Sequence, residues 1–188
     1  YEDLSAWHIG APAAAAPLVG NAAPHVLNVI VSGSASSHDP FSFSTVDGSG
    51  AQVRTVPVGG ADTISVVFNE SVNVSRDSLK IIGLRTANLP QVADFSYEPV
   101  TRTATWRYEG WAPADQYLLV LSDTITDADG NRLDGEWTNP ASVLTGSGAG
   151  VKSFPSGNGA PGGSFQFVMT LLPGDANQDL RVNNEDWD

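Results

Sequence analysis

The chain contains no cysteine, which excludes disulfides, thiolate zinc sites and cysteine nucleophiles. Basic residues are also scarce: 9 Lys and Arg stand against 21 Asp and Glu, so the formal net charge is -12 at pH 7. Nucleic acids and anionic membrane surfaces are bound through a basic footprint, so we expect neither as a partner. No apolar run approaches the roughly 18 residues of a membrane span, so we predict no membrane span.

The sequence also lacks the short motifs that mark common active sites. Neither G-x-S-x-G nor H-E-x-x-H occurs. The stretch GNGAPG (157–162) matches G-x-G-x-x-G, but its Pro and the surrounding Gly and Ser predict a loop and not a nucleotide site. Twenty-one acids offer many carboxylate pairs for glycoside hydrolysis, yet nothing selects one pair. We therefore predict that the chain is not an enzyme.

Turn-forming residues are plentiful, with 19 Gly and 12 Pro, and 41% of the residues are hydrophobic. Short segments with period-two or fully apolar patterns alternate with turn signals, and no window shows a convincing helical period. The predicted strands are 26–32, 52–58, 62–68, 71–74, 78–84, 94–99, 102–108, 116–122 and 164–172. Many short strands separated by turns predict an all-β fold, an antiparallel β-sandwich.

Three segments are expected along the chain. Residues 1–24 form an N-terminal arm or linker, because 11–24 holds seven Ala interrupted by three Pro. Residues 25–172 form the sandwich, which exceeds the ~100 residues of a minimal immunoglobulin-like domain. The excess is expected in 33–50 and 146–163, two stretches rich in Gly and Ser that we predict to be loops. Residues 173–188 form a separate acidic segment.

Three stretches carry a resemblance to a known family: TISVVFNESVNV (63–74), FSYEPVTRTATWRYEGW (95–111) and QYLLVLSDTITDADGNRLDGEW (116–137). They resemble bacterial immunoglobulin-like modules of the S-layer type, which combine V-x-F-x-E-x-V with a later Y-x-L-x-L and D-x-x-G-N-x-L-D. The resemblance covers about 60–137. It implies an immunoglobulin-like β-sandwich in a large extracellular or cell-surface protein, with a structural or adhesion role and no catalysis.

The last stretch, GDANQDLRVNNEDWD (174–188), has the spacing of a calcium-binding loop. An EF-hand loop places oxygen ligands at positions 1, 3, 5, 7, 9 and 12, because Ca²⁺ takes 6–8 oxygens in flexible geometry. With Asp175 at position 1, the predicted ligands are Asp175, Asn177, Asp179, the Arg181 carbonyl, Asn183 and Asp186. We predict Ca²⁺ as the cofactor of this EF-hand-like loop. The alternative is a solvated acidic tail.

The same stretch resembles a type I dockerin repeat, in which Asp replaces Glu at position 12. The resemblance implies a cohesin-like protein as partner, and a cell-surface polysaccharide is the alternative partner. Two departures stand out: Leu180 occupies position 6, where Gly is usual, and a dockerin has two repeats where the given sequence holds one. Val182, at position 8, is expected to point into the core.

A second acidic window lies at 123–136, where five acids and one Arg give a net charge of -4, as they also do in 174–188. Its candidate metal ligands are Asp127, Asp129, Asn131 and Asp134. The alternative is a turn, since Asp129-Gly130-Asn131 tolerates positive φ. The family resemblance favours the turn.

Carbohydrate binding is the alternative function. Trp106, Trp111 and Trp137 could line a sugar-binding face or serve as packing residues. An exposed, coplanar pair among them favours sugar binding, whereas burial of all three favours a spacer.

Overall fold

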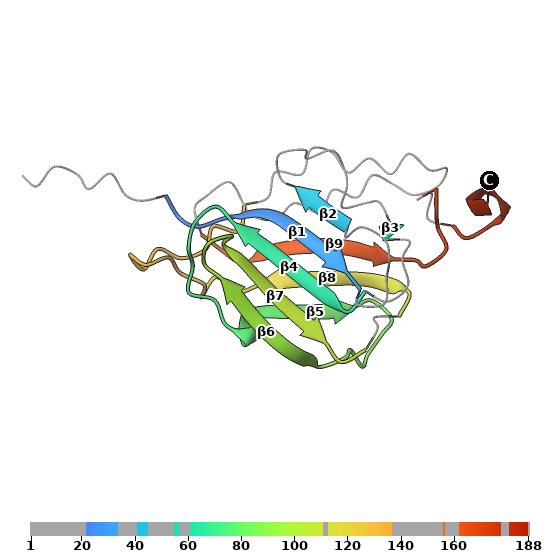
Figure 1. Ribbon diagram of the computed structural model, residues 1–188, viewed down its shortest axis with the longest axis horizontal. Helices are drawn as coiled ribbons and strands as arrows, with labels where there is room; N and C mark the ends of the chain where they lie inside the picture. Colours follow the sequence, from blue (N-terminus) through green and yellow to red (C-terminus); the bar gives the residue numbers. More distant parts are fainter. Residues whose placement is uncertain are drawn as a thin grey trace, which may run out of the picture.

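The strands of the protein form two sheets that lie face to face (Figure 1). The computed structural model describes residues 22–33, 41–44, 55–56, 61–110, 113–136, 156, 162–177 and 181–187. Its strands are β1 Val26–Ser32, β2 Phe41–Ser44, β3 Thr55–Val56, β4 Thr63–Phe68, β5 Leu79–Gly83, β6 Val92–Glu98, β7 Thr103–Tyr108, β8 Asp115–Leu121 and β9 Phe165–Leu171. Two short 3-10 helices, η2 Arg76–Ser78 and η3 Asn184–Trp187, complete the elements considered below. The predicted all-β class is confirmed.

The first sheet has the order β2-β1-β4-β7-β6, and the second has the order β3-β9-β8-β5. Neighbouring strands are antiparallel except for the two-residue β3, which runs parallel to β9. The predicted central position of 116–122 is confirmed, because β8 lies between β9 and β5.

One hydrophobic core fills the space between the sheets. Alternate residues of each strand point inward, as a period of two requires: β4 buries Ile64, Val66 and Phe68. The fully buried Trp106 of β7 donates its indole N–H to the carbonyl of Arg76 at 2.9 Å. The largest buried side chains are Trp106, Tyr117, Phe68, Phe165, Phe167, Leu119, Leu121, Ile125, Leu133 and Leu171. The interior between the two sheets is therefore mainly apolar.

Two strand predictions were wrong. Residues 71–74 do not form a strand: Asn73 makes only an isolated bridge to Thr126, and the backbone N–H of Val72 donates to the Tyr97 hydroxyl at 3.0 Å. The expected loop at 33–50 contains β2, which pairs with β1 and extends the first sheet. The short FSFS pattern of β2 is hidden by the Gly and Ser around it.

The described chain enters and leaves the sandwich at opposite ends (Figure 1). Residues 22–25 lead into β1 at one end, and β9 leads into the C-terminal segment at the other. Residues 1–21 of the predicted arm and most of 146–163 lie outside the described residues. Within the described part of the chain, no helix is long and apolar enough to span a membrane.

Candidate metal centre

The C-terminal segment leaves β9 through a tight turn. Gly174 has φ +95, a backbone conformation that glycine adopts at little cost. The backbone N–H of Asp175 then donates to the carbonyl of Leu172 at 3.1 Å. This turn directs Asp175 back against the end of the sandwich.

The carboxylate of Asp175 is anchored to a strand far away in sequence. Asp175 is fully buried, and its Oδ2 accepts a hydrogen bond from Thr55 Oγ1 at 2.6 Å. Thr55 is itself fully buried in β3, and the neighbouring Val56 accepts a bond from the Leu172 N–H at 3.1 Å. One contact from β3 therefore holds Asp175, the first residue of the predicted loop, and a second holds Leu172 just after the end of β9.

The carboxylate of Asp186 gathers the far side of the loop. Its Oδ1 accepts a bond from the Asn177 N–H at 3.3 Å, and its Oδ2 accepts one from the Asn183 N–H at 2.7 Å. The side-chain oxygen of Asn183 accepts a bond from the Glu185 N–H at 2.7 Å, at the start of η3. Predicted positions 3, 9 and 12 are thus brought together by hydrogen bonds.

The donor set fits a hard cation. Carboxylate and amide oxygens are the ligands that Ca²⁺ prefers, and the loop offers both. Asp179 lies outside the described residues, so only two of the three predicted carboxylates can be placed. Within the described ranges, no group of three or more His, Asp or Glu side chains converges on one point. A complete calcium set therefore requires Asp179 and the Arg181 carbonyl in addition to the residues placed here.

Val182 does not point into the core, and that prediction was wrong. Its side chain is 50% exposed. It lies on Gly174: a methyl group added there would come within 3.3 Å of Val182 Cγ1. The loop lies beyond the end of the sandwich, so its apolar residue packs on the start of the loop. Leu180 lies outside the described residues.

The first acidic window forms the expected turn. Thr126 and Arg132 make an antiparallel bridge, and Gly130 takes φ +87. The buried carboxylate of Asp127 accepts bonds from the N–H groups of Asp129 and Asn131 at 2.9 and 2.8 Å. The Asn131 side-chain amide donates a further bond to it at 2.8 Å.

These hydrogen bonds determine the ionisation of Asp127. Burial raises the pKa of the carboxyl group, but the bonds from the side chain and backbone of Asn131 and from the backbone of Asp129 outweigh it. The pKa of Asp127 is consequently lowered below its ordinary value. Its charge is stabilised by protein donors and does not need a cation.

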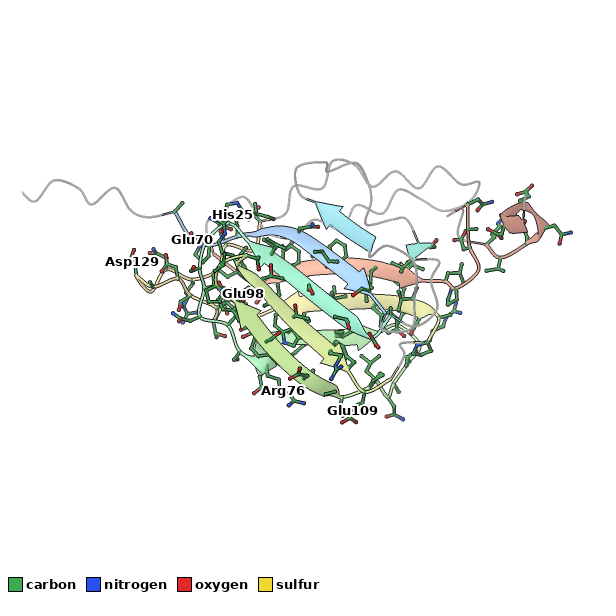
Figure 2. The ribbon with its side chains drawn as sticks, in the orientation of Figure 1. His25, Glu70, Arg76, Glu98, Glu109 and Asp129 are labelled. Carbon is green, nitrogen blue, oxygen red and sulfur yellow. The ribbon has the colours of Figure 1, made fainter. Side chains whose placement is uncertain are left out.

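Two other acids of this window do not share the hydrogen bonds of Asp127. Asp129 is exposed, and the carboxylate of Asp134 accepts a bond from the Glu136 N–H at 3.2 Å. Figure 2 shows Asp129 beyond one end of the sandwich, near His25 and Glu70, whereas the C-terminal segment lies beyond the other end. The two acidic windows therefore cannot share an ion.

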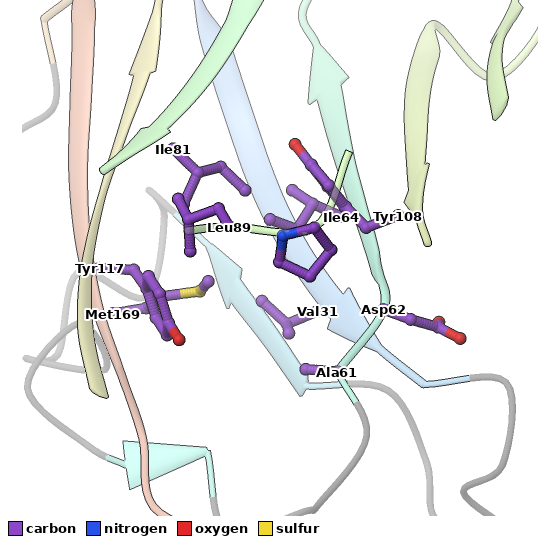
Figure 3. Close-up of a pocket in the computed structure, with 10 residues that line it drawn as sticks. Val31, Ala61, Asp62, Ile64, Ile81, Leu89, Tyr108, Tyr117 and Met169 are labelled. Atoms are coloured by element: carbon purple, nitrogen blue, oxygen red, sulfur yellow. The ribbon is translucent and has the colours of Figure 1, made fainter. Parts of the chain in front are cut away.

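The tryptophans and the cavity between the sheets are weaker candidates for a binding site than the C-terminal loop. Trp106 is 0% exposed and lies 5.2 Å from the Phe95 ring, so it cannot contact a sugar. Trp111 and Trp137 lie outside the described residues. A cavity of about 20 Å³ lies between the sheets near Leu89, Tyr108 and Tyr117, with Asp62 at its rim (Figure 3). It can hold one water molecule but not a sugar ring.

Comparisons with known proteins add no relative: no family model matches the chain, and no curated protein or solved structure matches it. The contact that the sequence could not indicate is the one between Thr55 and Asp175. The two residues are 120 positions apart, and a lone Thr in a strand carries no signal for a distant acid.

Proposed function

We propose that the chain is a non-catalytic, extracellular structural module of a larger cell-surface protein, and that its C-terminal loop binds Ca²⁺. The observation that carries the proposal is the hydrogen bonding of 174–177 and 181–187. Asp175 is anchored by Thr55, while the two oxygens of the Asp186 carboxylate accept the backbone N–H groups of Asn177 and Asn183.

Strand order supports an immunoglobulin-like sandwich. Constant-type immunoglobulin domains pair strands A-B-E-D in one sheet and C-F-G in the other. Read along the chain, β1-β4-β7-β6 and β5-β8-β9 follow this order, with β2 and β3 added at the edges. Tyr117 in β8 also donates its hydroxyl to the Pro113 carbonyl at 2.7 Å. This contact resembles the tyrosine corner of such folds.

The path of the chain supports a spacer role. Because the chain enters at one end of the sandwich and leaves at the other, the segments before and after it are separated by the length of the sandwich (Figure 1). The calcium loop would then form the junction to whatever follows. A metal that ties the loop to itself would stiffen that junction, since fewer backbone conformations remain open.

Charge supports calcium in this loop. The residues that would hold it are Asp175, Asn177, Asp179, the Arg181 carbonyl, Asn183 and Asp186. Five acids and only one Arg lie within 174–188, so the acids repel one another unless a further cation joins them. Bound calcium supplies the positive charge, while Thr55 and the loop backbone orient the acids.

Calcium titration of the chelator-treated protein by calorimetry tests the proposal. We expect one site in the wild type and binding at least about tenfold weaker in Asp186→Asn, because one ligand charge is lost. Asp129→Asn is the matched control: it removes one exposed acid from the other window and should leave the affinity unchanged. The absence of heat at millimolar calcium in a folded wild type would contradict the proposal.

The partner is a separate proposal. The resemblance to dockerin repeats makes a cohesin-like protein the first candidate, and the cell-surface setting makes a polysaccharide the second. Surface plasmon resonance with each candidate, in calcium and in chelator, distinguishes them. Binding that is equal in both buffers would show that the loop is not the contact.

A further inference from the structure

The structure assigns a second role to Thr55. We infer that its hydroxyl is a positioning group for the calcium loop, and that calcium bound by the loop in turn holds β3 against β9. This inference rests on the proposed calcium site. It names a residue outside the acidic segment that would determine how tightly the site binds.

The contact has the features of a support for a metal ligand. Thr55 and Asp175 are both 0% exposed, and their oxygens are 2.6 Å apart, the length of a hydrogen bond to an ionised carboxylate. A carboxylate has about four acceptor positions, so a bond from Thr55 to Oδ2 leaves Asp175 able to bind a cation. Groups that orient a ligand from behind commonly change metal affinity 10- to 100-fold when removed.

The same contact lies where the sandwich passes into the loop. The strand β3 has only two residues, paired in parallel as Thr55 with Thr170 and Val56 with Leu171. Two further bonds join β3 to the segment that follows β9. The Val56 carbonyl accepts the Leu172 N–H, and the Thr55 hydroxyl donates to Asp175. Fixing Asp175 therefore fixes β3.

This arrangement makes the two events mutually dependent. If docked β3 favours calcium by orienting Asp175, then calcium must favour docked β3 by the same factor. A short parallel strand with few hydrogen bonds can open locally at low cost, and its opening can report on the loop. Calcium is thus expected to protect the edge of the second sheet, although no β3 residue is a ligand.

Three variants separate this role from ordinary packing. Thr55→Val keeps the shape and removes the hydroxyl, and we expect calcium to bind about 10- to 100-fold more weakly. Thr55→Ser keeps the hydroxyl and should bind within about threefold of the wild type. Thr170→Val is the matched control, because the Thr170 hydroxyl accepts a bond from the Gln116 side-chain amide at 3.4 Å and bonds none of the described loop residues. It should leave the affinity unchanged.

Amide hydrogen exchange gives a second readout in the intact protein. The Leu172 N–H, which is bonded to Val56, should exchange about tenfold more slowly with calcium than with chelator. This calcium-dependent protection should be lost in Thr55→Val and kept in Thr55→Ser. A role in packing alone would change exchange equally in both buffers.

The outcomes separate the two proposals. A wild type that does not bind calcium overturns the proposed function. A wild type that binds calcium, with Thr55→Val binding equally well, overturns only the role of Thr55. Equal weakening in Thr55→Val and Thr55→Ser also overturns it, since the hydroxyl is then not the cause. If Thr55→Val does not fold, unchanged Leu172 exchange in the wild type upon calcium addition overturns the inference.

Discussion

The two acidic windows have the same net charge and different structures. Each holds five acids and one Arg. In 123–136 the acids diverge: Asp127 is buried in its own turn, whereas Asp129 is exposed. In 174–187 the Asp186 carboxylate draws together the main chain at Asn177 and Asn183. Net charge therefore does not identify a candidate metal site. The C-terminal window differs in that the backbone N–H groups of two predicted ligands bond the carboxylate of a third.

The windows also differ in what holds them to the sandwich. The first is flanked by Ile125 and Leu133, which are both 0% exposed, so its turn is fixed by apolar burial. The second begins with a polar contact from Asp175 to Thr55, and its Val182 is 50% exposed. The order of the second window therefore depends on hydrogen bonds and on the proposed ion, which makes it the part of the chain that calcium can change.

The largest difference between the sandwich, with its first acidic window, and the C-terminal loop is expected on acidification. Hydrogen bonds hold the pKa of Asp127 below its ordinary value. At Asp115, burial raises the pKa, but bonds from the backbone N–H groups of Arg85, Thr86 and Gln116 lower it to about 2. A lowered folded-state pKa gives stability that is present above about pH 4 and is lost as the pH falls towards 2. We expect the melting temperature in chelator to fall by roughly 5–10 °C over that range.

One variant assigns this pH dependence to the sandwich. Asp115→Asn should flatten the dependence of melting temperature on pH between 4 and 2, because the group no longer titrates. A slope in Asp115→Asn as steep as in the wild type would contradict the comparison.

A smaller effect is expected from removing the acid that closes the first turn. Asp127→Ala deprives two backbone N–H groups and one side-chain amide of their acceptor. We expect the melting temperature to fall by about 4–8 °C, with unchanged calcium affinity. Differential scanning calorimetry and calcium titration measure the two quantities.

Asp129→Ala is the control in the same turn. Its side chain is exposed, and the N–H that Asp127 binds belongs to the backbone and survives the substitution. The melting temperature should change by less than about 2 °C. If either variant weakened calcium binding, the first window would be a second metal site.

The sequence predicted the sandwich better than it predicted the loop. The segments around Phe68 and Trp106 alternate apolar and polar residues, and the segment around Leu119 is almost continuously apolar, so these strands were predicted directly. The strand β2 was missed because four residues within a Gly- and Ser-rich stretch carry too little pattern. The position of Val182 was wrong because the dockerin pattern assumes a core next to the loop.

The candidate site could be predicted only in part from the sequence. Local spacing predicts a set of ligands from Asp175 to Asp186 within one loop, and this set stays a prediction. It did not predict the bond from Thr55, because a contact between residues 120 positions apart depends on the packing of β3 beside β9. The turn at Asp127 was predicted in part. Gly130 indicated a turn in the sequence, but only the structure showed that the Asp127 carboxylate is buried.

The smallest expected effects come from one glycine in each window. Gly130 has φ +87 and Gly174 has φ +95, so alanine is strained at both by roughly 1–2 kcal/mol. Restricting the unfolded chain returns about 0.4–1 kcal/mol of this cost. At Gly130 the added methyl group meets no atom within 4 Å, so Gly130→Ala should lower the melting temperature by about 1–4 °C without changing calcium affinity.

Gly174→Ala should act on the loop instead. Its added methyl group would lie 3.3 Å from Val182 Cγ1, so the backbone strain is joined by a close contact across the loop. The core does not include this turn, and the melting temperature in chelator should change little. The calcium-competent loop becomes harder to form, and we expect calcium affinity to fall about three- to tenfold.

Adding Val182→Ala to Gly174→Ala relieves the contact but not the strain, so it should restore only part of the affinity. Full recovery in the double variant would show that the clash alone matters. A large fall in melting temperature for Gly174→Ala would show that the loop, like the first window, belongs to the core.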